Sequence, residues 1–177
     1  LRLVAGLEMP TSGHLTIDQK EVTHTPPHER QITYVGQRPA LYPQLNIAEN
    51  LALGVRWGQA KVPRDECEKR VQHAAELLQI SALLQRRPHE LSGGEQQRVV
   101  LGRAVVRQTS LWLLDEPFSS LDTVLAEKLS QDLHLLQRQL ALTIIHVTHN
   151  PLEALALADR VGMLGAGRLL QTGTPLE

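Results

Sequence analysis

The sequence lacks several features that would restrict its class. It has one cysteine, Cys67, so no disulfide can form within the chain and nothing indicates an oxidising compartment. The formal net charge of −1 gives no electrostatic reason to expect a nucleic-acid partner. No apolar run approaches the roughly 20 residues of a membrane-spanning helix, and the opening LRLVAGLE is too short for a signal peptide. Any membrane association is therefore expected to come through a partner.

The apolar pattern predicts an α/β domain. The chain has 177 residues, 42% of them hydrophobic, which is enough for one domain with a sizeable core. Uninterrupted apolar or β-branched segments alternate with helical patterns, which favours a parallel sheet. The expected strands are HLTID (14–18), QITYVGQ (31–37), SLWLL (110–114) and LTIIHVTH (142–149), followed by a β-hairpin over 160–173. The expected helices cover residues 1–7, 46–54, 65–80, 95–107, 123–140 and 151–158, with a loop over 56–64. The helical stretch 46–107 interrupts the alternation and is predicted to be a subdomain inserted into the sheet domain.

Two acids, Asp115 and Glu116, come directly after the apolar strand SLWLL. In open α/β sheets ligands bind outside the carboxyl ends of the strands, so both side chains are expected at a ligand-binding edge. Asp115 is suited to hold Mg²⁺, directly or through water, and Glu116 to polarise an attacking water. Taken alone, the pair is equally compatible with a simple cap at the start of a loop.

The stretch LSGGEQQRV (91–99) places a Ser-Gly-Gly turn at the start of a helix. Free backbone N–H groups and the helix dipole make such a turn a site for an anion, to which Ser92 adds a hydroxyl. The alternative is structural, with Ser92 as the N-cap of the helix over 95–107. The two interpretations are compatible.

LSGGEQQRV and the later LWLLDEPFSSLD (111–122), in this order, resemble the ATP-hydrolysing cassette of ABC transporters. The resemblance spans the whole chain. ALYPQLNIAEN, AELLQISALLQRRPHELSGGEQQR and GAGRLLQTGTPLE look most like the ATPases of maltose or glycerol-phosphate type sugar importers. It implies the α/β fold of P-loop NTPases (RecA-like), with a mostly parallel sheet. Residues 1–40 and 108–177 would form the RecA-like core, and residues 41–107 the inserted helical subdomain with the signature motif.

The resemblance also implies roles for single residues. Glu116, Gln37 and His149 are expected to act in catalysis, and Gln37 to share Mg²⁺ with Asp115. A second group is expected to contact the ATP that the opposite subunit of a dimer holds: Ser92, Gly93, Gly94, Glu95 and Asp122. The chain departs from the family's most frequent pattern at two points, with glutamate in place of glutamine at position 95, and with Asn150-Pro151 after the histidine in place of an acid and a polar residue.

The implied cofactors are ATP and Mg²⁺, and the implied partners form an importer. These are a second, identical or paired ATPase subunit, two permease subunits in the membrane and, indirectly, a solute-binding protein. Tyr42, Pro43 and Leu45 are expected to contact a permease, and the alternative for them is packing within their own loop. The protein would then work at the cytoplasmic face of the inner or plasma membrane. The solute, expected to be a carbohydrate, is selected by other subunits. Importers of polyamines, iron, sulfate or thiamine look similar enough to stay open as alternatives.

Two parts of the family pattern are absent, the phosphate-binding loop with the strands before it, and the regulatory barrel that often follows. No G-x-x-x-x-G-K-[ST] sequence occurs, and none of the lysines follows a glycine: Lys20, Lys61, Lys69 and Lys128. We therefore expect the chain to begin just after its phosphate-binding loop, without the first strands, and to bind ATP weakly by itself. Two alternatives stay open, an ABC ATPase outside transport and a non-catalytic subunit without a P-loop. The retained catalytic residues argue against the second.

Overall fold

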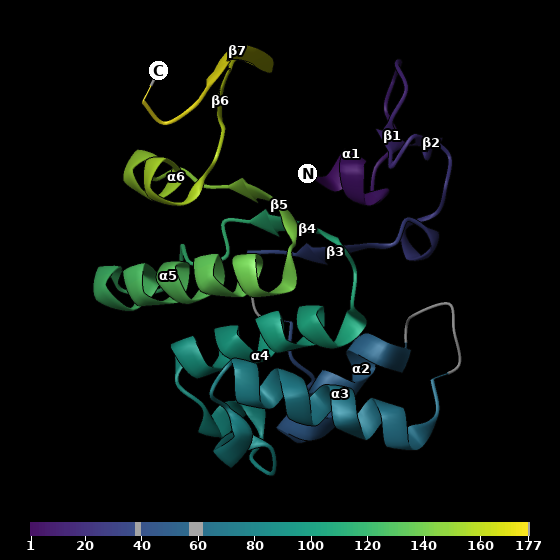
Figure 1. The fold of residues 1–177 in the computed structure, drawn as a ribbon, viewed down its shortest axis with the longest axis vertical. Coiled ribbons are helices and arrows are strands. Elements are labelled where there is room, and N and C mark those ends of the chain that lie inside the picture. Colours follow the sequence, from purple (N-terminus) through teal and green to yellow (C-terminus); the bar gives the residue numbers. More distant parts are fainter. Residues whose placement is uncertain (38–39, 57–61, 177) are drawn as a thin grey trace.

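A computed structural model describes residues 1–37, 40–56 and 62–176 of the chain. Its centre is a parallel sheet in the order β3 (Ile32–Val35), β4 (Leu111–Asp115) and β5 (Thr143–Val147) (Figure 1). The strands pair in register, so their carboxyl ends lie at the same edge of the sheet. The expected parallel sheet is therefore confirmed, with β4 as its central strand.

Both faces of β4 are buried, which explains its uninterrupted apolar sequence. Trp112 and Leu114 pack into a large cluster with the helices on one face. Leu113 packs on the other face, with Ile32 and with Ala5 of the short helix α1 (Arg2–Ala5). The exposed fraction of Leu113 and Leu114 is 0%. The central strand thus holds its carboxyl end in a rigid position.

Four helices lie on one side of the sheet (Figure 1): α2 (Ile47–Arg56), α3 (Arg64–Leu77), α4 (Gly93–Arg107) and α5 (Thr123–Leu140). The turns η2 (Ser81–Leu83) and η3 (Pro88–Glu90) lie between α3 and α4. One apolar cluster runs through α2, α4, α5 and the sheet, with Leu51, Val99, Leu133 and Trp112 as members. The helical stretch after β3 therefore shares its core with the sheet.

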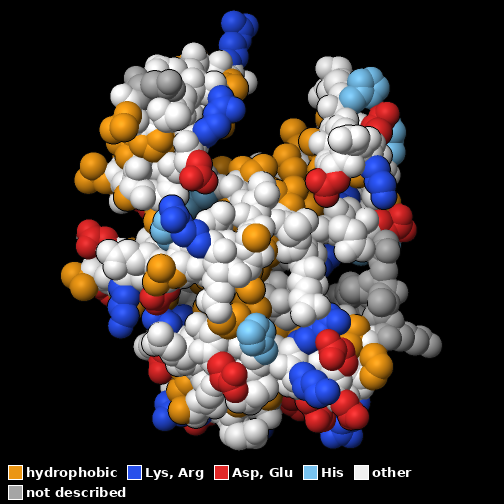
Figure 2. Space-filling view, viewed as in Figure 1, with side chains coloured by type: hydrophobic (Ala, Val, Ile, Leu, Met, Phe, Trp, Pro, Cys, Tyr) orange, Lys and Arg blue, Asp and Glu red, His pale blue; other side chains and the backbone are white. Residues whose placement is uncertain are grey.

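Two smaller arms project from the sheet, and Figure 2 shows the surface hollowed between them. The N-terminal arm holds the hairpin of β1 (Thr16–Ile17) and β2 (Lys20–Glu21), and the turn η1 (Pro27–Glu29) comes next. The C-terminal arm holds α6 (Pro151–Leu157) and the hairpin of β6 (Val161–Gly165) and β7 (Arg168–Gly173). The arms are less buried than the centre, since the exposed fractions of Met163 and Leu164 are 60% and 71%.

The expected elements are present, with bounds that differ by up to three residues at most of their ends. Asn46 caps α2 as expected, because its Oδ1 accepts the Glu49 N–H at 2.8 Å while the Glu49 carboxylate accepts the Asn46 N–H. The expected helix over 1–7 has only four residues, because Gly6 takes the left-handed φ of 76° that ends it. The expected loop over 56–64 lies partly outside the described residues. No helix within the described ranges is both long and apolar enough to cross a bilayer.

Candidate functional site

Asp115 lies at the carboxyl end of the central strand, where the sequence places it. The Tyr34 hydroxyl, from β3, donates to Asp115 Oδ2 at 2.8 Å. Burial, and after it this hydrogen bond, raises the pKa of Tyr34 to about 12, so the phenol stays protonated and keeps donating at neutral pH. The sequence analysis missed Tyr34, which fixes the orientation of the candidate metal-binding carboxylate.

Glu116 begins the turn after β4 in an unusual backbone conformation. Its φ is 47°, in the left-handed region that non-glycine residues seldom adopt. The Glu116 N–H donates to the carbonyl oxygen of Val147, the last residue of β5, at 2.9 Å. This bond ties the turn to the neighbouring strand and sets where the carboxylate lies. Backbone strain of this kind clusters at functional sites.

Two further side chains named by the sequence analysis meet the Glu116 carboxylate. Gln37 Nε2 donates to Glu116 Oε2 at 3.3 Å, and His149 Nδ1 lies 3.3 Å from the same oxygen. Gln37 Nε2 also reaches Ser119 Oγ at 3.4 Å, in the turn after β4. The three residues, here called the Glu116 group (Glu116, Gln37 and His149), come from segments that succeed three adjacent strands. The structure therefore brings together the three residues expected to act in catalysis.

Ser92 begins α4 and forms a closed capping arrangement with Glu95. The Ser92 N–H and hydroxyl both donate to Glu95 Oε2, at 2.8 and 2.7 Å, and the Glu95 N–H donates back to Ser92 Oγ at 3.4 Å. These hydrogen bonds hold the pKa of Glu95 below its usual value. Ser92 is thus the N-cap of α4, as the structural interpretation predicts. In the described part of the chain, no hydrogen bond or ion pair joins this helix start to the Glu116 group.

The glycine pair after Ser92 packs against the start of α5. A Cβ on Gly94 would lie 2.7 Å from Leu125 Cδ2, and a Cβ on Gly93 would lie 3.4 Å from a methyl carbon of Leu121. Asp122 is the N-cap of α5, since its Oδ1 accepts the Leu125 N–H at 3.0 Å. Gly93, Gly94 and Asp122 therefore lie where two helix starts meet.

The loop that carries Tyr42, Pro43 and Leu45 is held from beneath by a buried amide. Asn50, with an exposed fraction of 0%, accepts the Tyr42 N–H at 2.9 Å through Oδ1. Its Nδ2 lies within 3.2 Å of the carbonyl oxygens of Tyr42, Leu45 and Asn46. Tyr42 and Pro43 are exposed, while Leu45 is half-buried. The loop therefore presents two of its three predicted contact residues on a rigid support.

Arg103, on α4, is a further residue that the sequence analysis missed. Its guanidinium carbon lies 5.9 Å from the centre of the Tyr42 ring, and its Nη1 donates to the carbonyl oxygen of Ala40. Burial lowers the pKa of Arg103. The arginine joins the helix that begins at Ser92 to the loop that comes after Gln37.

The residues at the carboxyl edge fit a magnesium ion better than a transition metal. Among the described residues, no three His, Cys, Asp or Glu side chains gather as a complete metal cluster. Mg²⁺ in nucleotide enzymes needs only one or two carboxylates, because phosphate oxygens and waters complete its coordination. Asp115 and the amide oxygen of Gln37 are oxygen ligands of that kind. The edge therefore suits Mg²⁺ that arrives with a nucleotide.

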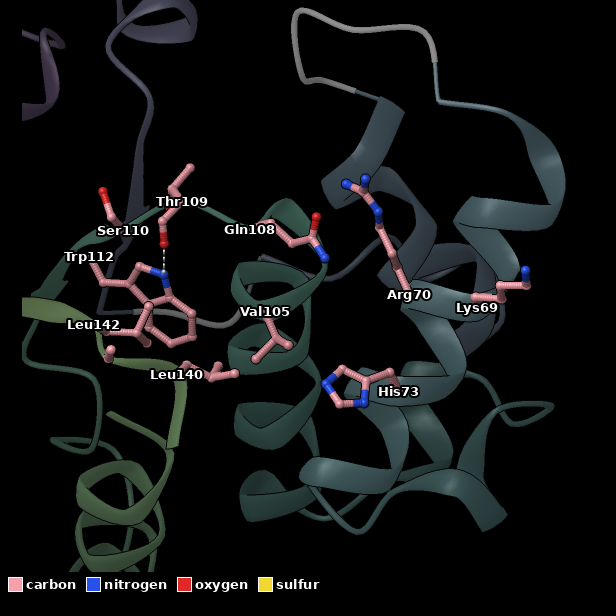
Figure 3. A pocket seen from close by; sticks show the side chains of 11 residues that line it. Lys69, Arg70, His73, Val105, Gln108, Thr109, Ser110, Trp112, Leu140 and Leu142 are labelled. Carbon is pink, nitrogen blue, oxygen red and sulfur yellow. Dashed lines mark hydrogen bonds between the residues drawn. The ribbon is translucent and has the colours of Figure 1, made fainter. Parts of the chain in front are cut away.

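A cavity of about 490 Å³ lies away from this edge (Figure 3). Thr109 and Ser110 line it just before β4, and Lys69 and His73 line it from α3. The indole N–H of Trp112, on the same wall, donates to the carbonyl oxygen of Thr109 at 3.2 Å. These residues mark the amino end of β4, opposite the end that carries Asp115. The cavity is therefore separate from the Glu116 group.

Comparison with known proteins shows the family to which the chain belongs. The family model for ABC transporters matches residues 1–119. The sn-glycerol-3-phosphate import ATP-binding protein UgpC 1 of Rhizobium etli is 46% identical over all of this chain, which covers 50% of that protein. The maltose/maltodextrin import ATP-binding protein MalK of Escherichia coli K12 is also 46% identical over all of this chain, which covers 47% of that protein. The chain thus spans about half the length of the curated relatives it matches.

A solved structure resembles the fold over almost the whole chain. It is the ATP-binding cassette MJ0796 as a dimer in a post-hydrolysis state with ADP and Pi. The TM-score is 0.82 at 27% sequence identity, over 98% of this chain and 78% of that chain. The α/β fold expected for P-loop NTPases is therefore confirmed. From the matched family model, the shared fold and the convergence at Glu116, the chain belongs to the ABC transporter family of ATP-binding cassettes.

Proposed function

We propose that this chain is part of the ATP-binding and ATP-hydrolysing subunit of an importer and couples ATP hydrolysis to solute uptake. The observation that carries the proposal is the contact of Gln37 and His149 with one oxygen of Glu116. The two curated relatives are import ATP-binding proteins for glycerol phosphate and for maltose or maltodextrin. A carbohydrate or a sugar-like phosphate ester is therefore the proposed solute.

In the proposed reaction Glu116 orients and polarises the water that attacks the terminal phosphate. When MgATP is bound, ATP would supply the phosphoryl group and Mg²⁺ would offset the negative charge of the phosphates. Asp115, which accepts the Tyr34 hydroxyl at 2.8 Å, would hold Mg²⁺. Gln37 and His149 flank the carboxylate of Glu116, so each restricts its rotation and adds a polar group beside the water. These roles need the geometry that the left-handed turn at Glu116 imposes.

A dimer is the second part of the proposal. Ser92, Gly93, Gly94, Glu95 and Asp122 would contact a nucleotide held by the opposite subunit. The two helix starts that meet at these residues support this role, because helix N-termini attract phosphate. In this arrangement residues 1–40 and 108–177 form the nucleotide-binding core, and residues 41–107 form the helical subdomain that faces the other subunit.

A permease is the proposed membrane partner. Exposed Tyr42 and Pro43, with Leu45, form a small apolar surface on the loop supported by Asn50. Exposed apolar clusters of this kind mark interfaces. We place the protein at the cytoplasmic face of the membrane through this contact, with a solute-binding protein as an indirect partner.

The test replaces Glu116 in the full-length gene product. Glu116→Gln keeps the shape of the side chain but removes the base, so turnover should fall by about 10²- to 10⁴-fold while nucleotide binding persists. Glu127→Gln, on the exposed surface of α5, is the matched control and should leave both unchanged. Near-normal hydrolysis by Glu116→Gln would exclude Glu116 as the base. Absence of hydrolysis in the unsubstituted protein, with its dimeric and permease partners present, would favour a non-catalytic subunit.

A further inference from the structure

The short turn that carries His149 is held by one hydroxyl and one carboxylate. Thr148 Oγ1 donates to Glu153 Oε2 at 2.6 Å, and the Asn150 N–H donates to Thr148 Oγ1 at 3.0 Å. Asn150 Oδ1 in turn accepts the Leu152 N–H at 3.1 Å and caps α6. The hydrogen bonds thus run from the residue after His149, through the residue before it, to Glu153 in the first turn of α6.

The other oxygen of Glu153 faces the interior. Glu153 Oε1 lies 3.3 Å from His146 Nε2, and the side chains of both residues are only 15% exposed. Neither atom makes a hydrogen bond in the described structure. Burial lowers the pKa of His146, and the carboxylate of Glu153 opposes that effect. The two side chains are therefore in contact between β5 and α6 without forming a hydrogen bond to each other.

His146 also contacts the turn that begins at Glu116. Its ring packs edge-on against Phe118, with ring centres 6.1 Å apart and planes at 82°. Phe118 is buried, with an exposed fraction of 3%, and lies two positions after Glu116. Glu153 consequently contacts the segment that carries His149 directly, and the segment that carries Glu116 through His146.

Packing cannot by itself hold His149. Its side chain is 70% exposed, and its contact with Glu116 spans 3.3 Å. An exposed side chain in such a contact depends on the backbone that carries it, because solvent offers many competing rotamers. In this turn the backbone on both sides of His149 is fixed by the Thr148 hydroxyl and the Glu153 carboxylate.

We propose that Glu153 is a positioning residue that, through the Thr148 hydroxyl, holds His149 against Glu116. The inference rests on the proposed hydrolytic function, which it deepens. Removal of the hydroxyl should free the turn and let His149 leave Glu116, while the fold of β5 and α6 remains. Misplacement of a catalytic group by about 1 Å lowers turnover by roughly 100-fold.

The test uses Thr148→Val and Thr148→Ser in the full-length gene product. Valine keeps the shape of threonine without the hydroxyl, whereas serine keeps the hydroxyl that Glu153 accepts. We expect Thr148→Val to lower kcat by about 10- to 100-fold with KM unchanged within about twofold, and Thr148→Ser to retain turnover. In a His149→Ala background, Thr148→Val should cause no further loss, because the histidine it positions is gone. An equal loss in both backgrounds, or an equal loss with serine, would overturn the proposal.

A measurement without hydrolysis separates this proposal from the proposed function. Nuclear Overhauser contacts between the His149 ring and the Glu116 side chain should be present in the unsubstituted chain and in Thr148→Ser, and lost in Thr148→Val and Glu153→Ala. If the contacts are lost in Thr148→Val as expected, but the unsubstituted protein never hydrolyses ATP, the positioning role is supported and the hydrolytic function is refuted. Their persistence in Thr148→Val would refute the positioning role, whatever the activity.

Discussion

The substitution Asn50→Ala should release the loop proposed to contact the permease. Asn50 is fully buried, and its amide lies close to four backbone groups of the loop before α2. The Nδ2 group carries two hydrogens for three carbonyl oxygens, so at most two of those bonds form at once. With the bond from the Tyr42 N–H to Oδ1, the side chain makes about three hydrogen bonds at a time. Each contributes about 1 kcal/mol net, so their loss should cost the loop about 3 kcal/mol.

Hydrogen–deuterium exchange at the Tyr42 amide measures this cost directly. That N–H donates to Asn50 Oδ1 at 2.9 Å, so its protection reports opening of the loop. A loss of about 3 kcal/mol corresponds to roughly 100-fold faster exchange. Gln72→Ala is the control, because Gln72 makes an exposed hydrogen bond to Glu76 on α3 and should leave Tyr42 unchanged.

Asn50→Asp distinguishes the acceptor role of Asn50 Oδ1 from the donor role of its Nδ2. The carboxylate keeps an acceptor for the Tyr42 N–H but loses both donors and adds a buried charge. Exchange in this variant should be at least as fast as in Asn50→Ala. Protection of the Tyr42 amide in Asn50→Ala within about threefold of the unsubstituted chain would show that Asn50 does not support the loop.

Single contacts elsewhere in the chain give further predictions. The hydrogen bonds from Ser92 lower the pKa of Glu95, so the stability that Glu95 contributes is present above its unfolded pKa of about 4.5 and is lost as the pH falls through the folded value. The melting temperature of Glu95→Gln should therefore fall less on acidification than that of the unsubstituted protein. An equal fall of the melting temperature with pH in both proteins would contradict this. A Cβ on Gly54 would lie 2.5 Å from the carbonyl oxygen of Arg103, so Gly54→Ala should lower the melting temperature despite its better helix propensity. Gly102→Ala is the comparison and should cost less, because the obstacle there is the tip of the Leu51 side chain, 2.6 Å away. Tyr42→Glu should uncouple transport and spare the ATPase activity of the subunit without its permease; a parallel loss of folding, seen by circular dichroism, would mean that Tyr42 is core. Residues 1–177 contain no G-x-x-x-x-G-K-[ST] sequence, so isothermal titration of this chain alone should find weak MgATP binding, and micromolar affinity would refute that expectation.

The sequence was sufficient for the sheet and for the group around Glu116. The apolar run before Asp115 is typical of a strand buried on both faces, and parallel strands bring the residues after their carboxyl ends to one edge of the sheet. Gln37 and His149 come after the two neighbouring strands, so their approach to Glu116 is a consequence of topology. The motif resemblance named them, and the strand order explains why they meet.

The supporting residues could not be read from the sequence in the same way. Asn50 lies in a helical pattern, where asparagine is a poor helix former, and this was the one available signal of a special role. Arg103 and Glu153 have nothing in their local sequence that distinguishes them from solvated helix residues. Their roles depend on groups of other segments, the carbonyl oxygen of Ala40 for Arg103 and the Thr148 hydroxyl for Glu153. Such contacts are set by three-dimensional packing, which one sequence does not specify.

The order of the strands has a consequence for how the chain folds. Ile32 of β3 pairs with Leu111 of β4, and Leu111 pairs with Thr143 of β5. At a synthesis rate of roughly 5–20 residues per second, β3 leaves the ribosome about 4–16 s before its partner strand. The intervening helices form from local contacts in far less time, since helix formation takes about a microsecond. The helical stretch is therefore expected to fold first and to shorten the effective loop between β3 and β4, so that β4 joins β3 across a segment that has already folded.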